Sequence, residues 1–417
     1  MRVYIKNLGC KSNRYESDKL AEYCQRKGVN VQFDDFRKSD IYIVNTCTVT
    51  HIADRKSRQA INLIKNRDSD AKIIIFGCGP RVNYDLYKRL NGVFEVCKDR
   101  EKVINLLNEQ LDLADIKEGK FNIQANSTRT RALIKIQDGC NNFCSYCIIP
   151  YSRGMPKSRP SDEIVDEINK KSSEGFKEIV ITGINVNKYD ADGLTLTGLL
   201  KTIVKKTDIP RIRLSSIEPM QVSEEFLEVL GNKRFCKHLH ASLQSGSDDI
   251  LKKMNRNYSS SDYMEMSKKL VQNIPGIALT TDIITGFPGE TDENFLESIN
   301  LSKNVGFSKI HVFKYSKRKG TKAAEMDDQI SEEVKNNRSL QLREVSAQLR
   351  DNFIKSQIGK TTKVLFEKKN KDGFYEGLTG TYIKVYVNAN LSENLINSII
   401  SVKLTDKFKD GLKAVLA

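Results

Sequence analysis

Short apolar runs alternate with helix-like segments along most of this 417-residue chain. In the first hundred residues, helix-like segments at 14–27 and 52–66 separate apolar runs at 2–6, 41–45 and 72–76. Short strands that are apolar throughout and separated by helices are typical of parallel sheets covered on both faces. The sequence therefore predicts an α/β fold that begins with a parallel-sheet domain over residues 1–111.

The same alternation resumes after a polar segment at 112–130, which we interpret as a linker. Six further strands are expected near 131–137, 178–182, 211–215, 238–242, 278–285 and 309–315. Six βα units within roughly 190 residues are fewer than the eight of a complete barrel. We therefore predict a partial (βα)6 barrel in residues 126–356, ending in a long helix over 331–356.

The last segment, residues 357–417, changes character. Short strand-like runs are separated here by turn residues at 370–373 and 388–390, a pattern typical of β-hairpins. We predict a small all-β module and expect it to be a barrel.

The charge balance is strongly basic. The chain has 68 lysine and arginine residues against 53 aspartate and glutamate residues, a net charge of +15. This suits a polyanionic partner such as nucleic acid, although charge alone does not identify one. No apolar run approaches the ~18 residues that a membrane-spanning helix needs, and the first residues form a strand pattern rather than a signal peptide. We expect a cytoplasmic protein without a membrane partner.

Nine cysteines occur, and an odd number in a large chain without export signals favours metal ligands over disulfides. Cys10, Cys47 and Cys78 each follow one of the first three predicted strands by a few residues. Because the carboxyl ends of parallel strands meet at one edge of a sheet, we expect these three thiols to converge. Cys24 and Cys236 match no ligand pattern and are interpreted as buried filler.

Three more cysteines, Cys140, Cys144 and Cys147, lie within eight residues directly after a predicted strand. Thiolates in a tight loop suit zinc or an iron–sulfur cluster. A closed zinc site needs a fourth ligand, and the nearest histidines, His238 and His240, are far along the chain. Three ligands on a four-iron cluster would leave one iron open to a cofactor.

The C-x3-C-x2-C pattern of this loop, with Tyr146 before the last cysteine, resembles the radical S-adenosylmethionine superfamily. The resemblance implies that the open iron chelates S-adenosylmethionine, which one electron cleaves to methionine and a 5′-deoxyadenosyl radical. It also implies cofactor contacts at the carboxyl ends of the barrel strands: Tyr146 (through its backbone), Thr182, Gly183, Ser242, Gln244 and Ile284.

Other segments narrow the resemblance to the methylthiotransferase family. They are Leu8 to Asn13, Asn45 to Thr50, Gly77 to Cys78, Pro150 to Gly154, Leu243 to Ser247 and Gly286 to Thr291. The resemblance implies that Cys10, Cys47 and Cys78 hold a second 4Fe-4S cluster. It further implies that residues 357–417 form a TRAM-like RNA-binding domain.

Members of this family act on isopentenyladenosine in tRNA, on threonylcarbamoyladenosine in tRNA, or on an aspartate of a ribosomal protein. The segments 45–50, 213–219 and 315–321 look most like the threonylcarbamoyladenosine class, whereas Asn185 to Asp190 is similar to the isopentenyl class. The resemblance thus implies methylthiolation at carbon 2 of N6-threonylcarbamoyladenosine next to the anticodon. Two S-adenosylmethionine molecules would serve, one as methyl donor and one as radical source. Alternatives from other classes are a zinc-containing RNA-binding protein and an iron–sulfur electron carrier.

Five of the nine residues from Lys314 to Lys322 are basic. A charge run is usually a solvated surface, but this one follows the sixth predicted strand, at the end where functional residues of βα barrels gather. We predict RNA contacts at Lys317, Arg318 and Lys319, and at Arg153 after the cysteine loop. Aromatic residues among the lysines of the last module suit base stacking, although half of these rings must also form its core: Phe366, Phe374, Tyr375 and Tyr382. The expected partners are the tRNA anticodon loop, an electron donor and a sulfur source, while no catalytic side chain is singled out.

Overall fold

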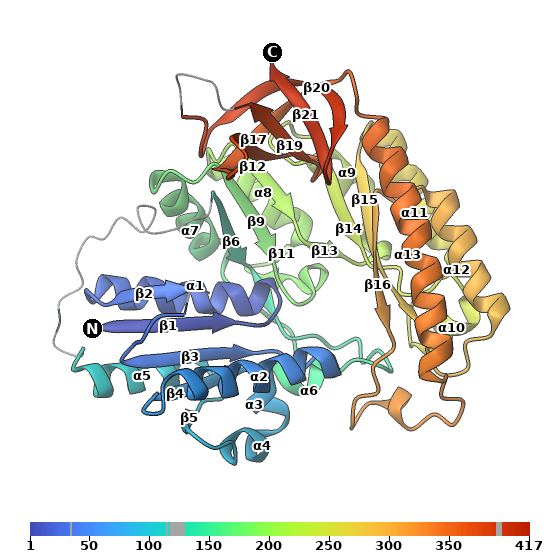
Figure 1. The fold of residues 1–417 in the computed structure, drawn as a ribbon. Coiled ribbons are helices and arrows are strands. Elements are labelled where there is room, and N and C mark those ends of the chain that lie inside the picture. The colour runs from blue at the N-terminus through green and yellow to red at the C-terminus, as the bar shows by residue number, and fades with distance from the viewer. Residues whose placement is uncertain (34–35, 114–115, 117–129, 389–393) are drawn as a thin grey trace. The chain divides into compact units, whose positions relative to one another are not determined.

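The computed structural model describes all residues except 34–35, 114–115, 117–129 and 389–393 (Figure 1). Most of the predicted linker at 112–130 lies outside the described residues. The chain forms two compact units. The first contains Met1–Asn126, Asp138–Pro156 and Ser316–Ala324, and the second contains Ser127–Gln137, Lys157–Tyr315 and Glu325–Ala417.

A five-stranded parallel sheet, ordered β2-β1-β3-β4-β5, forms the centre of the first unit. Its strands are β1 (Arg2–Asn7), β2 (Asn30–Phe33), β3 (Ile41–Thr46), β4 (Ile73–Gly77) and β5 (Val93–Val96). Its helices are α1 (Lys11–Arg26), α2 (His51–Arg67), α3 (Cys78–Val82), α4 (Tyr84–Lys88) and α5 (Arg100–Leu111). The three predicted strands are confirmed as the middle of this sheet, and the two shorter strands at its edges were not predicted.

Both faces of this sheet are covered, as apolar strands require. Alternate strand residues such as Ile5 and Ile43 pack in one core with Leu20 of α1 and Leu107 of α5. The intervening residues face a second core that contains Ile61 and Ile64 of α2. Every residue of β3 and β4 is buried. The first unit also includes the short helix α6 (Ile149–Arg153) and the 3-10 turn η4 (Lys322–Ala324).

The second unit contains the six predicted parallel strands. They are β6 (Arg131–Lys135), β9 (Glu178–Thr182), β12 (Arg211–Leu214), β14 (His238–Ala241), β15 (Ala278–Thr285) and β16 (Lys309–Lys314). They form a three-stranded sheet, β12-β9-β6, and a four-stranded sheet, β13-β14-β15-β16, in which β13 (Ser216–Ile217) comes almost directly after β12. The neighbour order thus follows the chain order, as in a partial barrel.

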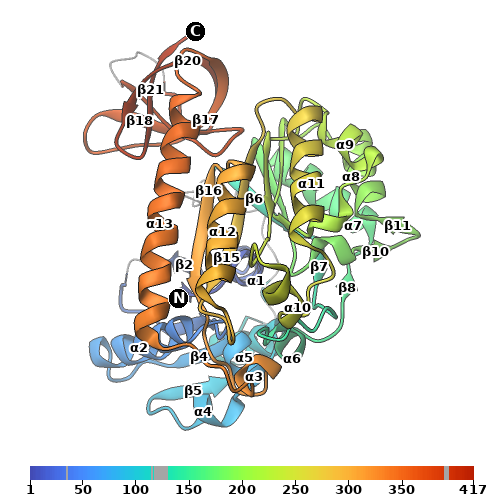
Figure 2. The same ribbon diagram turned by 90° about the vertical axis from the view of Figure 1, so that its right-hand side faces the viewer.

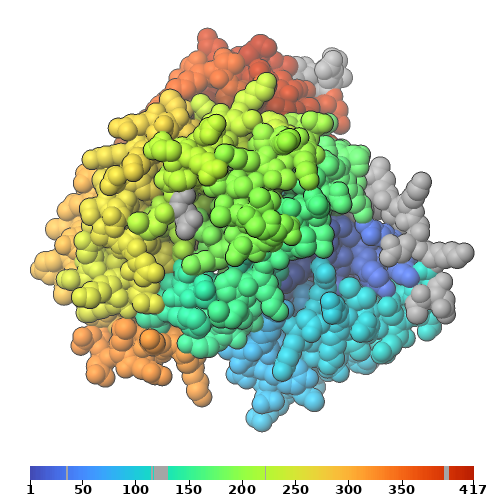
Figure 3. Space-filling view, turned by 180° about the vertical axis from the view of Figure 1, so that it is seen from behind, coloured from blue at the N-terminus to red at the C-terminus, as the bar shows by residue number. Residues whose placement is uncertain are grey.

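Helices cover one face of these strands (Figure 1), and residues of this region, coloured green to yellow, form much of the surface seen from behind (Figure 3). The helices are α7 (Ser161–Ser173), α8 (Leu196–Lys206), α9 (Glu224–Leu230), α10 (Asp248–Lys253), α11 (Ser260–Asn273), α12 (Asp292–Val305) and α13 (Glu332–Lys355). Leu239, Leu279 and Ile310 of the strands share one core with Leu270 of α11 and Leu342 of α13. Shorter pieces are β7 (Gln137–Asp138), β8 (Lys157–Ser158), β10 (Asp190–Ala191), β11 (Leu194–Thr195), η2 (Val186–Lys188) and η3 (Pro219–Gln221).

The carboxyl-terminal module is a closed barrel with the strand order β17-β18-β19-β21-β20. Its strands are β17 (Thr361–Lys369), β18 (Phe374–Thr379), β19 (Lys384–Asn388), β20 (Ile399–Phe408) and β21 (Gly411–Leu416). Helix α13 runs to this barrel (Figure 2), and Ile354 near its end packs in the barrel core. The predicted all-β barrel is confirmed.

The four aromatic residues suggested for base stacking all pack against other side chains, and two of them form part of the barrel core, as expected. Phe366 and Tyr375 are buried in the barrel core. The Tyr382 ring lies 4.0 Å from the Arg213 guanidinium and packs edge-on against His238, on the βα strands. The Phe374 ring packs against Tyr386 and Phe408. Phe366 and Tyr375 thus complete an otherwise aliphatic barrel core, whereas Tyr382 packs outside it.

Candidate functional site

Three cysteines lie at the carboxyl ends of the three central strands of the first unit. Cys10 follows β1 and precedes the first turn of α1, Cys47 comes directly after β3, and Cys78 comes directly after β4 as the first residue of α3. Since β1, β3 and β4 are neighbours in the sheet, the structure brings the three loops together, as the sequence predicted. Cys47 and Cys78 are buried, and Cys10 is exposed.

The side chain of Asn13 connects two of these thiols. Its Oδ1 accepts from Cys10 Sγ at 3.4 Å and from Cys78 Sγ at 3.8 Å. Its Nδ2 donates to Asn45 Oδ1 at 2.8 Å and to the Thr46 carbonyl at 3.0 Å, which fixes the amide orientation. Asn13 and Asn45 were not predicted as site residues, although both lie in segments that resemble the methylthiotransferase family.

Arg153 also lies at this thiol group. Its Nε donates to Cys78 Sγ at 3.3 Å, and its Nη2 donates to Asn13 Oδ1 at 2.8 Å. Its Nη1 donates to Glu16 at 2.9 Å and to Asp138 at 3.0 Å. The Arg153 side chain is only 1% exposed. We predicted Arg153 as a surface contact for RNA, but its guanidinium is buried and fully engaged within the protein, so it is not available to a phosphate.

Burial controls the ionisation of this thiol group. Desolvation, with a smaller contribution from the neighbouring Cys78 and Cys10 thiols, raises the pKa of Cys47 to about 11. Desolvation also raises the pKa of Cys78, while the positive charge of Arg153 acts in the opposite direction. Neutral thiols are therefore favoured until a metal replaces their protons. Three converging thiols beside one buried cation are a donor set that fits an iron–sulfur cluster, because thiolate is its usual ligand.

The second cysteine group lies on the loop from Asp138 to Pro156, in the same unit. Gly139 has φ +72°, and a Cβ there would lie 2.1 Å from the Met155 carbonyl oxygen, so only glycine fits. The loop closes on itself because Cys140 N donates to the Gly154 carbonyl at 3.0 Å and Cys147 N donates to the Cys144 carbonyl at 2.9 Å. All three cysteines are half-buried. This compact loop presents three thiols within eight residues, which also fits an iron–sulfur cluster.

The other predicted cofactor contacts lie in the second unit, except Tyr146, which is on the cysteine loop of the first. Thr182 is the last residue of β9 and Gly183 follows it. Ser242 comes directly after β14, and Ile284 is in β15. Gln244 has φ +69° and pairs with β15, because its N–H donates to the Asp282 carbonyl at 2.8 Å. Cofactor binding by these residues stays a prediction.

The three residues predicted to contact RNA at 317–319 differ in their exposure to solvent. Lys317 and Lys319 are exposed, whereas Arg318 is half-buried and its Nη2 donates to Thr48 Oγ1 at 2.5 Å. Ser316 Oγ accepts from the His51 N–H at 3.1 Å. The segment therefore lies beside the loop after Cys47, with two lysines free to face solvent.

The chain matches two protein families and is similar to several known proteins over nearly its whole length. Residues 134–302 match the Radical SAM superfamily, and residues 2–96 match Uncharacterized protein family UPF0004. The protein named Threonylcarbamoyladenosine tRNA methylthiotransferase MtaB of Bacillus subtilis is 36% identical, covering 96% of this chain and 93% of its own length. The protein of the same name from Thermotoga maritima is 38% identical, covering 98% of this chain and 96% of its own length. The chain belongs to the methylthiotransferase family of radical S-adenosylmethionine enzymes.

This methylthiotransferase is also similar to relatives with another substrate in their name. The tRNA-2-methylthio-N(6)-dimethylallyladenosine synthase of Thermodesulfovibrio yellowstonii is 35% identical, covering 99% of this chain and 97% of its own length. A solved radical S-adenosylmethionine methyltransferase, TsrM from Kitasatospora setae, shares the fold with a TM-score of 0.56 at 17% identity, covering 75% of this chain and 74% of that one. S-adenosylmethionine and a 4Fe-4S cluster are the cofactors of this superfamily. No helix in the described part of this methylthiotransferase is long and apolar enough to cross a membrane.

Proposed function

We propose that this methylthiotransferase adds a methylthio group to carbon 2 of N6-threonylcarbamoyladenosine next to the anticodon of tRNA. The main support is similarity over nearly the whole chain to relatives named for this reaction. The two cysteine groups on separate loops give the chain the ligands for two clusters. Such a protein works where tRNA is found, so we expect it in the cytoplasm. An electron donor and a sulfur source are its further expected partners.

We propose a separate role for each cysteine group. Cys140, Cys144 and Cys147 would hold the cluster at which S-adenosylmethionine is cleaved, and Cys10, Cys47 and Cys78 would hold the cluster that handles sulfur. The clusters supply the electron and the sulfur chemistry, which ordinary side chains cannot provide. The chain's own part is to orient the thiols through Asn13 and to offset their negative charge through Arg153.

Iron content tests the two-cluster proposal. Reconstituted wild-type protein should carry about eight irons, twice the content of one four-iron cluster. Replacing Cys140, Cys144 and Cys147 together by alanine should leave about half of this iron. Loss of all iron in that variant would show that the first group holds no cluster by itself.

The polarity of one strand face supports the threonylcarbamoyl substituent over the isopentenyl one. Isopentenyl is apolar, whereas threonylcarbamoyl carries amide groups and a carboxylate. On β14–β16 the helix-covered face is apolar, but the opposite face carries His240, Asp282 and His311. A substituent held along such a polar face is matched better by amide and carboxylate groups than by an apolar chain.

A second candidate is isopentenyladenosine, favoured by the Asn185–Asp190 segment and by the relative from Thermodesulfovibrio yellowstonii. The structure gives one residue of this segment a local role. Asn187 Oδ1 accepts from the Glu218 N–H at 2.7 Å and so holds the chain after β13. Its Nδ2 is buried and has no hydrogen-bond partner among the described residues, so we propose that it contacts the bound nucleoside.

Mass spectrometry of tRNA nucleosides from cells lacking the protein distinguishes the two candidates. We expect loss of the 2-methylthio derivative of threonylcarbamoyladenosine, restored by the wild-type gene and not by Cys144→Ala. Loss of the 2-methylthio isopentenyl nucleoside alone would establish the second candidate instead.

A further inference from the structure

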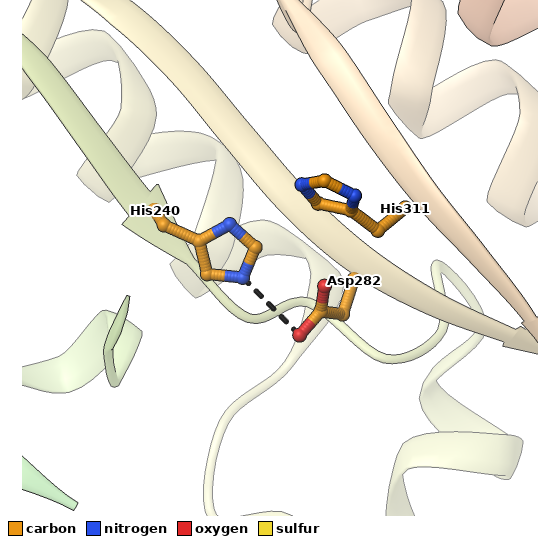
Figure 4. Close-up of side chains that lie close together, drawn as sticks. All are labelled: His240, Asp282 and His311. Atoms are coloured by element: carbon orange, nitrogen blue, oxygen red, sulfur yellow. Dashed lines mark ion pairs between the residues drawn. The ribbon is translucent and has the colours of Figure 1, made fainter. Parts of the chain in front are cut away.

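Two histidines and one aspartate converge in the second unit, whereas the six predicted cysteine ligands belong to the first. His240 is on β14, Asp282 on β15 and His311 on β16, and their side chains point toward one another (Figure 4). In the strand register Asp282 is opposite His311, and His240 is opposite Thr280, two residues before Asp282. Side chains two residues apart in a strand share a face. The three residues therefore share the face opposite the helices.

Their spacing suits a metal ion. His240 Nε2 and Asp282 Oδ2 are 3.2 Å apart, and the ligand atoms of all three residues lie within 4.8 Å of one another. Zinc bonds of about 2.0–2.1 Å in tetrahedral geometry place two ligand atoms about 3.4 Å apart. His240 Nε2 and Asp282 Oδ2 are thus already about as far apart as two ligand atoms of one zinc ion. A movement of about 1.4 Å, within reach of a half-buried imidazole ring, brings the most distant atoms into range.

The neighbouring residues support ligation as well. His240 Nδ1 lies 3.0 Å from Thr280 Oγ1, and Thr280 Oγ1 lies 3.1 Å from His238 Nε2. A ligating histidine usually donates its second ring N–H to such a partner, which fixes the tautomer. When His240 Nδ1–H donates to Thr280 and Thr280 donates to His238, the lone pair of His240 Nε2 faces Asp282. Two acceptors then face each other, and a cation between them satisfies both.

We propose that His240, Asp282 and His311 bind one divalent first-row transition ion, with zinc as the natural probe. Two imidazoles and one carboxylate are a common set for zinc and for ferrous iron, whereas magnesium and calcium prefer oxygen ligands only. Three protein ligands leave a position open for water or an oxygen atom of a bound molecule. This centre has nitrogen and oxygen donors, unlike the two thiol groups, and zinc binding to it can be measured without tRNA.

Zinc binding to the full-length, cluster-loaded protein tests the proposal. The protein is equilibrated anaerobically with zinc, and zinc and iron are measured in the same sample. Asp282→Asn and His311→Gln should each lose one zinc per chain with iron unchanged. Thr280→Val, which removes the orienting hydroxyl, should weaken zinc binding about 10–100-fold. His51→Ala is the matched control, because His51 is exposed and lies in the first unit.

Zinc X-ray absorption supplies the second readout. Nitrogen and oxygen neighbours around the zinc are expected, since sulfur neighbours would place it at cysteines. Far-UV circular dichroism shows whether the variants are folded, and Asp282→Asn preserves the shape of the side chain. Equal zinc content in wild type, folded Asp282→Asn and folded His311→Gln would overturn the proposal, as would a sulfur coordination shell.

Discussion

Replacing Arg153 by methionine should loosen the first unit around its thiol group. The change removes the cation that donates to Cys78, Asn13, Glu16 and Asp138. Glu16 is itself buried, with its side chain 10% exposed. At 2.9 Å and an effective dielectric constant of about 20, the Arg153–Glu16 attraction alone is roughly 6 kcal/mol before desolvation is subtracted. Breaking a buried pair from one side costs about 3–5 kcal/mol.

Native-state hydrogen exchange measures the loss of local stability in the segments around Arg153. Peptides from α1, α3 and the 138–156 loop should exchange about 10²- to 10³-fold faster in Arg153→Met, because each 1.4 kcal/mol corresponds to tenfold. Peptides from the β17–β21 barrel, in the other unit, should be unchanged. Arg89→Met, which alters an exposed arginine of the same unit, should change neither set.

A second substitution separates charge from packing. Arg153→Met with Glu16→Gln should lose less stability than the sum of the two single changes, because the carboxylate is no longer left buried without its cation. Arg153→Lys should be intermediate, since lysine keeps the charge but cannot make the same forked set of bonds. Strict additivity of the double variant, or equal exchange in Arg153→Met and Arg89→Met, would refute this reasoning.

Three further predictions concern cofactor chemistry, pH and RNA. Cys144→Ala should abolish 5′-deoxyadenosine release, whereas Cys47→Ala should retain part of it while losing methylthio product; equal loss in both would contradict the proposed division. Burial raises the pKa of Cys24 to about 12 from 9.0, so its thiol is protonated in the folded state and ionised in the unfolded state between these values. The Cys24 thiol therefore does not change the free energy of unfolding below pH 9 and lowers it as the pH rises above 9. In urea titrations, Cys24→Ala should reduce the slope of the free energy of unfolding against pH in that range by at most about 1.4 kcal/mol per pH unit. The double change Lys317→Ala with Lys319→Ala should reduce the slope of log binding constant against log salt concentration for tRNA by about 1.4–1.8. The control changes two exposed lysines of other helices, Lys170 and Lys205, to alanine. An unchanged slope in the Lys317 and Lys319 variant, or an equal reduction in the control, would exclude these contacts.

The placement of the cysteines could be predicted because it depends on local patterns. An apolar run followed by a turn fixes where a strand ends, and parallel pairing then brings Cys10, Cys47 and Cys78 to one edge. The long helix predicted at 331–356 is observed as Glu332–Lys355 for the same reason. Cys24 is fully buried in α1, as its helical spacing indicated.

The interactions of individual polar side chains could not be predicted in this way. Arg153 belongs to a basic sequence context, and only the tertiary structure shows that Glu16 and Asp138 surround it. His240, Asp282 and His311 are separated by tens of residues and meet only through the register of three strands. From the sequence alone, deletion of residues 357–417 is expected to weaken tRNA binding while leaving both clusters assembled. In the structure the buried Arg213 donates to the carbonyls of Thr379 and Gly380 in that barrel, so point substitutions are the better test of RNA binding.

The reaction itself tests the central claim most directly. Cluster-loaded protein is incubated under reducing, anaerobic conditions with methyl-labelled S-adenosylmethionine and tRNA that carries either N6-threonylcarbamoyladenosine or isopentenyladenosine. We expect 5′-deoxyadenosine release and a labelled 2-methylthio nucleoside from the threonylcarbamoyladenosine tRNA only. A labelled nucleoside from the isopentenyladenosine tRNA alone would contradict the proposed substrate, and 5′-deoxyadenosine without any labelled nucleoside from either tRNA would contradict tRNA methylthiolation by this chain.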